Sequence, residues 1–164
     1  MLLAGDVGGT NMRLALFEEE GGRLVERRRA RFATRDFPTL HAALEDFLAG
    51  ERRLDAAAFG VAGPVRHGRA EGTNVTFSID AAEIRADLGV PAVVLNDLEA
   101  NGWGLAELAP SDFEVLNRGE NEPAGNGALI SAGTGLGEAI LFREGKGFVP
   151  MPSEGGHASF APKN

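Results

Sequence analysis

The chain has 164 residues, a net charge of −8, an isoelectric point near 4.9 and no cysteine. This length suits one domain or slightly more. The acidic charge disfavours a nucleic-acid or anionic-membrane surface, and the lack of cysteine excludes disulfides and thiolate zinc sites. Because no apolar stretch could span a bilayer and no secretory signal is present, we expect a cytoplasmic protein with no nucleic-acid and no membrane partner.

The first third of the chain predicts three antiparallel strands and a helix. Strands are expected over 2–7, 12–17 and 24–32, the first two largely apolar and the third rich in arginine, with glycine pairs at the two turns between them. The arginines of the third stretch favour a solvated strand over a basic patch. Apolar residues at helical spacing then run from 37 to 48. Pro38 near the start of this segment and Gly50 near its end are typical of helix boundaries.

Helices and strands alternate in the next part of the chain. A buried strand is expected over 54–61, a helix capped by Asp80 and running through Leu88 to a stop at Gly89, a strand over 92–95 and a helix over about 98–108. Such alternation implies crossover connections and parallel strands. The predicted fold class is α/β, with a mixed five-stranded sheet and helices on both faces, and residues 1–110 form a small N-terminal lobe.

The last part of the chain repeats the opening pattern. Two apolar stretches, 128–132 and 138–142, flank the turn Gly133-Thr134-Gly135-Leu136-Gly137. Two or three strands cannot close a second core. Residues 111–164 are therefore predicted to begin a second, similar lobe that is incomplete within this chain.

The opening turn, Asp6-Val7-Gly8-Gly9-Thr10-Asn11, is the first candidate site. Glycines allow close approach of a ligand and positive φ, and consecutive backbone N–H groups suit phosphate. A carboxylate beside a phosphate indicates a divalent metal, which makes Asp6 a candidate metal ligand. An ordinary β-hairpin is the alternative. The similar turn at Gly133 favours phosphate, because two turns can hold a polyphosphate from two sides.

Asn96 and Asp97 follow a buried strand, where open α/β sheets bind ligands. The Asp97 carboxylate can accept a proton from a substrate hydroxyl that Asn96 orients. Capping of the next helix by Asp97 is the alternative. Asn74 is a further candidate for ligand contact, and closing a turn is its alternative role.

A sugar site is suggested near the C-terminus by Glu154-Gly155-Gly156-His157. Glu154 is an acceptor and His157 both donates and accepts, which suits neighbouring sugar hydroxyls. A surface turn is the alternative. Zinc is disfavoured, because the chain has three histidines and no cysteine.

These motifs, in this order, resemble the bacterial glucokinase family, within the sugar-kinase and actin-like superfamily. The matching stretches are Gly5 to Asn11, Thr73-Asn74, Leu95-Asn96-Asp97, Ala132 to Gly137, and Glu154 to His157 with Phe160-Ala161-Pro162. The resemblance covers essentially the whole chain, and its last motif is the most specific. It implies a ribonuclease H-like (actin-like ATPase) fold and ATP-dependent phosphorylation of glucose at O6, the first step of glycolysis.

The resemblance also implies a role for each candidate residue. Asp97 would be the catalytic base for the glucose 6-hydroxyl, and Asp6 would lie near Mg²⁺. The ATP phosphates would be bound by Gly5, Asp6, Val7, Gly8, Gly9, Thr10, Asn11, Gly133 and Thr134. Glucose would be held by Asn74, Asn96, Asp97, Gly135, Glu154 and His157. A homodimer is compatible with the resemblance.

Family members continue beyond the end of this chain, with most of the adenine pocket and a further sugar-binding glutamate. The resemblance therefore implies an N-terminal portion that is weakly active or inactive alone. The alternatives are a sugar-binding regulatory protein of the same fold, a kinase for another hexose, and an actin-like structural ATPase. A regulator would keep Glu154 and His157 without depending on Asp97, whereas a structural ATPase would not need the sugar pair.

Overall fold

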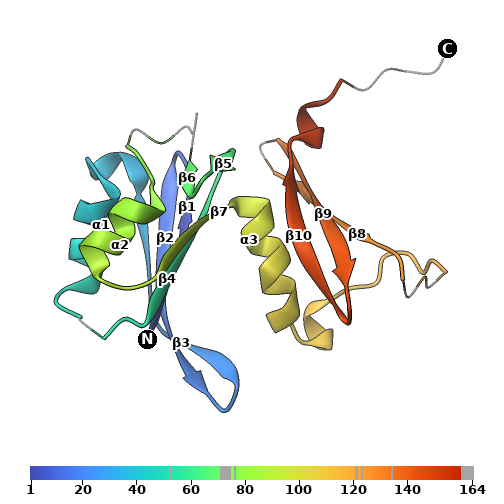
Figure 1. Ribbon diagram of the computed structural model, residues 1–164, viewed down its shortest axis with the longest axis horizontal. Helices are drawn as coiled ribbons and strands as arrows, with labels where there is room; N and C mark the ends of the chain where they lie inside the picture. The colour runs from blue at the N-terminus through green and yellow to red at the C-terminus, as the bar shows by residue number, and fades with distance from the viewer. Residues whose placement is uncertain are drawn as a thin grey trace. The chain divides into compact units, whose positions relative to one another are not determined.

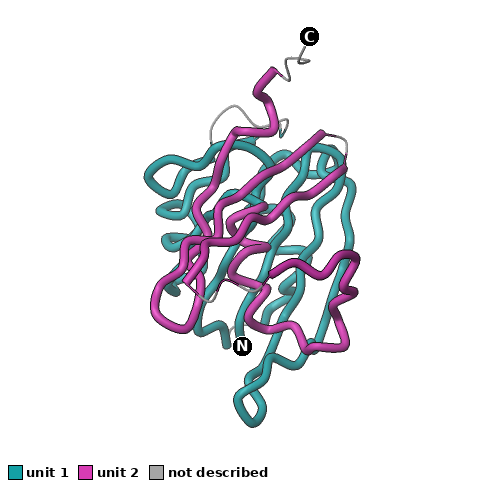
Figure 2. The backbone as a smooth tube through the Cα atoms, turned by 90° about the vertical axis from the view of Figure 1, so that its right-hand side faces the viewer, with its two compact units in different colours: residues 1–97 teal, residues 98–164 magenta. Residues whose placement is uncertain are grey.

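The computed structural model describes residues 1–51, 53–70, 75, 77–120, 122, 124–133 and 135–159. It divides into two compact units, unit 1 (Met1–Asp97) and unit 2 (Leu98–Asn164), which Figure 2 colours separately. The division into lobes at 1–110 and 111–164 concerns the complete fold and remains a prediction. Thr73, Asn74, Thr134 and 160–162 lie outside the described residues. Within the described ranges, every helix is too short or too polar to cross a membrane.

Unit 1 is built on a mixed five-stranded sheet with the strand order β3-β2-β1-β4-β7 (Figure 1). The first three strands form an antiparallel meander, and β4 and β7 run parallel to β1. The strands are β1 (Leu2–Val7), β2 (Asn11–Glu20), β3 (Arg23–Ala33), β4 (Ala56–Val61) and β7 (Ala92–Asn96). The predicted fold class is thus confirmed. A short hairpin, β5 (Val65–Arg66) and β6 (Arg69–Ala70), was not predicted.

Two helices, α1 (Leu40–Leu48) and α2 (Ala81–Leu88), lie on one face of this sheet (Figure 1). The helices begin at side-chain caps: the Thr39 hydroxyl accepts from the N–H of Ala42, and the Asp80 carboxylate accepts from the N–H of Ala82. Gly89 ends α2 in a left-handed conformation. A 3₁₀ turn, η1 (Thr34–Asp36), links β3 to the segment before α1.

The core of unit 1 lies between the sheet and these helices. Three rows of residues in register cross the helix-covered face: Leu16, Leu3, Ala57 and Ala92; Leu14, Gly5, Phe59 and Val94; and Met12, Val7, Val61 and Asn96. Phe59 is fully buried and fills the space above Gly5, where a Cβ would lie 2.3 Å from the ring. Packing therefore requires glycine at position 5.

Unit 2 contains helix α3 and a three-stranded antiparallel sheet with the order β10-β9-β8. Its elements are α3 (Asp97–Gly104), η2 (Leu105–Glu107), η3 (Pro110–Asp112), β8 (Gly127–Ala132), β9 (Leu136–Glu144), β10 (Gly147–Ser153) and η4 (Gly155–His157). The α-helix is shorter than predicted, because the chain continues after Gly104 as the 3₁₀ turn η2. Gly102 and Gly137 allow close packing of α3 on the sheet, since a Cβ at either position would lie within 2.7 Å of a side chain.

Strand β10 was not predicted, and its two prolines explain why. Pro150 and Pro152 cannot donate ladder hydrogen bonds, so the sequence reads poorly as a strand. They are tolerated because β10 is an edge strand that pairs with β9 alone among the described strands.

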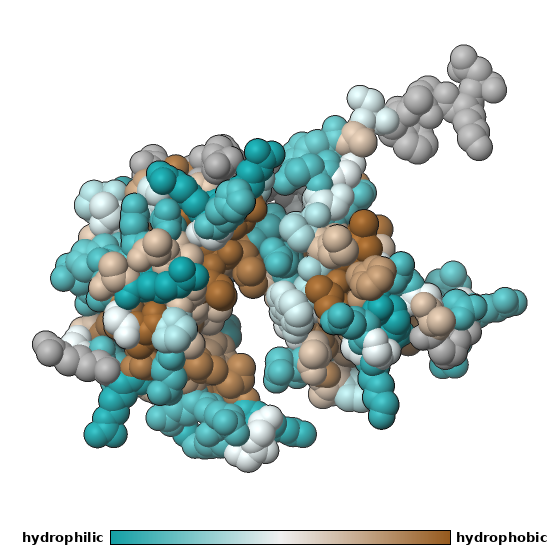
Figure 3. All heavy atoms as spheres, viewed as in Figure 1, coloured by the Kyte–Doolittle hydropathy of each residue, from teal (hydrophilic) through white to brown (hydrophobic). Residues whose placement is uncertain are grey.

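The two units contain the same arrangement of three strands. Both β1-β2-β3 and β8-β9-β10 are antiparallel meanders in which a glycine-containing turn joins the first two strands. The predicted repetition is confirmed at this level. In unit 2, apolar side chains reach the surface over the strands (Figure 3), including Ile130, Ile140, Phe142 and Met151, each about half exposed or more.

Candidate functional site

In unit 1, the carboxyl ends of three parallel strands meet at one edge of the sheet. Val7, Val61 and Asn96 lie in register at the ends of β1, β4 and β7. The opening turn follows β1, and Asp97 follows β7. Because neighbouring strands are spaced by about 4.8 Å, the turn and Asp97 lie roughly 10 Å apart along this edge. Ligands of open α/β sheets bind beyond such strand ends.

The opening turn is a tight reversal over Gly8, Gly9 and Thr10. The N–H of Gly8 donates to the carbonyl of Asn11 at 3.0 Å. Neither Gly8 nor Gly9 is among the described glycines with positive φ, so this turn does not use the positive φ that glycine allows. Glycine suits position 8 because there is little room for a side chain: a Cβ there would lie 3.3 Å from the Asn11 carbonyl oxygen.

Thr34, the first residue after β3, holds this turn, although no sequence motif pointed to it. Thr34 is 1% exposed, its Oγ1 donates to the Gly8 carbonyl at 2.7 Å, and its N–H donates to the Thr10 carbonyl at 3.0 Å. The C=O and N–H of a trans peptide point in opposite directions. Thr34 therefore turns the N–H of Gly9 away from itself, and no acceptor for that N–H is found in the described part of the chain.

Replacing Thr34 with valine is expected to lower the free energy of unfolding by about 1–3 kcal/mol, because the Gly8 carbonyl loses its donor. Amide-hydrogen exchange at Gly8 is expected to become faster as the turn loosens. Urea unfolding and exchange rates measure these effects. Thr34→Ser keeps the hydroxyl and is the matched control. A Thr34→Val chain as stable as the unsubstituted one would show that the hydroxyl is not needed and contradict this role.

Asp6 and Val7 point to opposite faces of β1. Val7 is fully buried in the core, whereas the Asp6 side chain is 58% exposed on the other face. An Arg13 Nη1 lies 2.8 Å from the Asp6 carboxylate. Asp6 is therefore exposed beside the turn as the partner of Arg13, and Val7 anchors the end of the strand beneath it.

Asn96 and Asp97 differ in their surroundings. Asn96 is 8% exposed, and its Nδ2 donates to the Gly63 carbonyl at 3.1 Å. Gly63 has φ near 116°, a conformation that favours glycine. Asp97 is half-buried and is the first residue of α3, so it lies within the first turn of the helix instead of at the preceding cap position. A carboxylate is favourable there because of the helix dipole.

In unit 2, the second glycine turn lies beside the Glu154–His157 segment. The N–H of Gly133 donates to the Gly135 carbonyl at 2.9 Å, just before β9. A Cβ on Gly156 would lie 1.9 Å from the Leu136 carbonyl oxygen, so glycine lets this segment lie against the first residue of β9. Gly135, Glu154 and His157 are thereby brought to one corner of unit 2.

Glu154 and His157 interact directly across the 3₁₀ turn η4. Nδ1 of His157 lies 3.0 Å from Oε2 of Glu154, and both side chains are more than half exposed. One oxygen and one nitrogen are thus held together at the surface. Such a pair can accept from and donate to neighbouring hydroxyl groups.

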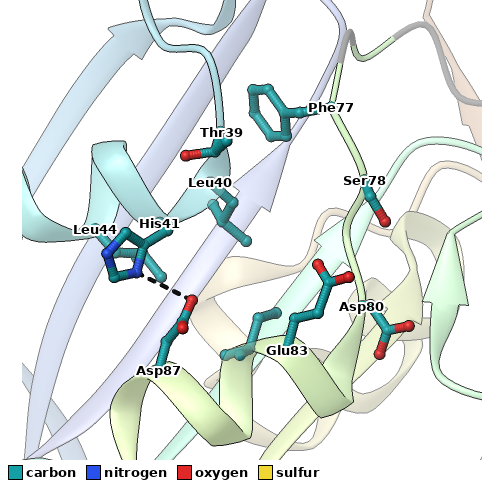
Figure 4. A pocket seen from close by; sticks show the side chains of 10 residues that line it. Thr39, Leu40, His41, Leu44, Phe77, Ser78, Asp80, Glu83 and Asp87 are labelled. Atoms are coloured by element: carbon teal, nitrogen blue, oxygen red, sulfur yellow. Dashed lines mark hydrogen bonds and ion pairs between the residues drawn. The ribbon is translucent and has the colours of Figure 1, made fainter.

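A separate small pocket of about 170 Å³ lies between α1 and α2 (Figure 4). It is lined by residues of both helices and of the segment before α2, including the pair His41 and Asp87, 3.0 Å apart. None of its lining residues is a candidate site residue. The candidate site consists of strand ends and turns and does not include this pocket.

Comparison with known proteins identifies the family. The glucokinase family profile matches residues 3–164. Glucokinase of Nostoc punctiforme is 37% identical over 168 aligned residues, which cover 100% of this chain and 49% of that protein. The chain thus spans about half the length of the curated relatives it matches.

Solved structures agree with this match. The crystal structure of glucokinase from an Antarctic psychrotroph superposes with a TM-score of 0.82 at 28% identity, covering 99% of this chain and 52% of that one. Glucokinase from Balamuthia mandrillaris, solved with glucose, shares the fold with a TM-score of 0.72 at 22% identity, covering 99% and 50%. From the profile match and these likenesses it follows that the chain belongs to the glucokinase family.

Proposed function

We propose that the protein to which this chain belongs transfers the γ-phosphoryl group of ATP to O6 of glucose. The observation that carries the proposal is the placement of the Gly8–Thr10 turn and Asp97 at one edge of the unit 1 sheet. Phosphoryl transfer needs a site for the phosphates and a carboxylate that orients the attacking hydroxyl. Membership of the glucokinase family and the glucose bound to the Balamuthia enzyme support glucose as the sugar.

In this proposal, Asp97 accepts the proton of the glucose 6-hydroxyl while O6 bonds to the γ-phosphorus and the bond to the β-phosphate oxygen breaks. Asn96 orients the same hydroxyl. The phosphates are bound by Gly8, Gly9, Thr10 and Asn11 of the opening turn and by Gly133 and Thr134 of the second turn. Asn74, Gly135, Glu154 and His157 hold the sugar. The side chains of Asn74 and Thr134 lie outside the described residues.

Asp6 is the residue proposed to hold Mg²⁺. Mg²⁺ is commonly bound by one or two carboxylates together with substrate phosphates. A surface carboxylate beside the opening turn fits that mode, and the described residues contain no group of three metal-binding side chains that would form a complete cage. When bound, Mg²⁺ would neutralise charge on the phosphates. A cytoplasmic location and a homodimer belong to the same proposal.

Glucose is expected to stabilise the folded chain and so to raise its melting temperature. At a glucose concentration 100 times the Kd, the free energy of stabilisation is about 2.7 kcal/mol. His157→Ala should reduce this stabilisation because it removes a sugar contact. His41→Ala, an exposed histidine of α1, is the matched control and should retain it. Thermal unfolding with glucose, mannose and galactose measures the effect. The proposal fails if glucose gives no shift, or if His157→Ala retains the full shift.

A further inference from the structure

Strands β2 and β3 place two arginines opposite each other beside the opening turn. Arg13 pairs in register with Arg31 and, on its other side, with Asp6. These three residues lie on the face of the sheet away from α1 and α2, because their neighbours Met12 and Phe32 lie on the core face. A row of charge therefore crosses β1, β2 and β3 near the turn.

The two arginines have different partners. Arg13 forms an ion pair with the Asp6 carboxylate at 2.8 Å. Arg31 donates from Nε to the neutral Oδ1 of Asn11 at 3.1 Å. Asn11 is the first residue after the turn, so its hydrogen bond with Arg31 places the guanidinium next to the turn.

This arrangement has an electrostatic cost in folding. Like charges directly opposite on neighbouring strands destabilise a sheet, and the one carboxylate in this row, Asp6, is paired with Arg13. The row Asp6, Arg13 and Arg31 thus carries a net positive charge beside the opening turn. A bound anion would relieve the repulsion, and a guanidinium matches the geometry of phosphate oxygens.

We propose that Arg31 is a further phosphate-binding residue, which contacts the polyphosphate held by the opening turn. Because Nε is bonded to Asn11, the Nη groups of the guanidinium would donate to the anion. This inference rests on the proposed function for the identity of the anion, the triphosphate of a nucleotide. It extends the phosphate site from the β1–β2 turn to β3.

The test is calorimetric titration of the 164-residue chain with tripolyphosphate in the presence of Mg²⁺. Arg31→Gln is expected to weaken binding about tenfold, as for loss of one charge-assisted hydrogen bond. Arg31→Lys should recover part of the affinity, because it restores the charge without the fork. Arg29→Gln is the matched control, since Arg29 lies on the same face of β3, two residues farther from the turn and paired with Glu26. It should leave the affinity unchanged.

The inference is overturned if the unsubstituted chain does not bind tripolyphosphate, if Arg31→Gln binds as tightly, or if Arg29→Gln weakens binding equally. Because Arg31 is exposed, the variant should fold, and its melting temperature and glucose shift verify this. The glucose shift also separates the two proposals. If glucose does not raise the melting temperature of the unsubstituted chain but tripolyphosphate binding still depends on Arg31, the proposal of glucose phosphorylation is refuted. Arg31 would then remain a phosphate ligand.

Discussion

Asp97→Asn is expected to lower the rate of glucose 6-phosphate formation by about 10²–10⁴-fold, the usual contribution of a general base. Asparagine keeps the shape of the side chain at the start of α3 but cannot accept the proton of the hydroxyl. Glucose-dependent thermal stabilisation should persist, because the other sugar contacts remain. Single-turnover assays with labelled ATP and the chain in excess suit the weak activity expected of these 164 residues.

Asp87→Asn is the matched control for this experiment. Asp87 lies in α2 and pairs with His41, away from the candidate site residues. It should leave the transfer rate unchanged. An unchanged rate in Asp97→Asn would show that Asp97 is not the base. If the protein is instead a sugar-binding regulator, glucose would raise the melting temperature of the unsubstituted chain and of both variants. None of the three would transfer a phosphoryl group.

Local signals in the sequence predicted most elements of the fold. Strand β1 has the predicted bounds, and α2 begins after Asp80 and ends before Gly89 as expected. These elements are defined by residues within a few positions of their ends. Strand β10 was missed because its prolines argue against a strand, and only its position at the sheet edge makes them acceptable.

The candidate site was predictable where it follows from topology. Parallel strands bring their carboxyl ends to one edge, so the opening turn and Asp97 could be expected to lie on the same edge. Thr34 could not be found in this way, because its contact with Gly8 depends on the register of β3 against β2. The Arg31–Asn11 contact depends on the same register. Sequence motifs reveal the residues of a turn, whereas the residues that support it come from distant parts of the chain.

Gly5 shows that a residue within a motif can have a structural role. The family resemblance implied that Gly5 belongs to the phosphate site, but in the structure it lies in the core-facing row beneath Phe59. Gly5→Ala is expected to cost about 1–3 kcal/mol in unfolding free energy, because its Cβ would overlap the Phe59 ring. Phe59→Ala should cost about 3–5 kcal/mol, the largest single loss expected in unit 1.

The double variant distinguishes packing from phosphate binding at position 5. With alanine at 59, the space above Gly5 is empty, so the combined loss in urea unfolding should fall short of the sum of the single losses by about 1 kcal/mol or more. Gly104→Ala is the matched control, since a Cβ at that position meets no atom within 4 Å. Strict additivity, or a stable Gly5→Ala chain that binds tripolyphosphate weakly, would contradict the packing role and return Gly5 to the phosphate site. Non-additive losses would mean that Gly5 and Phe59 act together in packing. Gly5 would then set how closely the Phe59 ring approaches β1, the strand that leads into the opening turn.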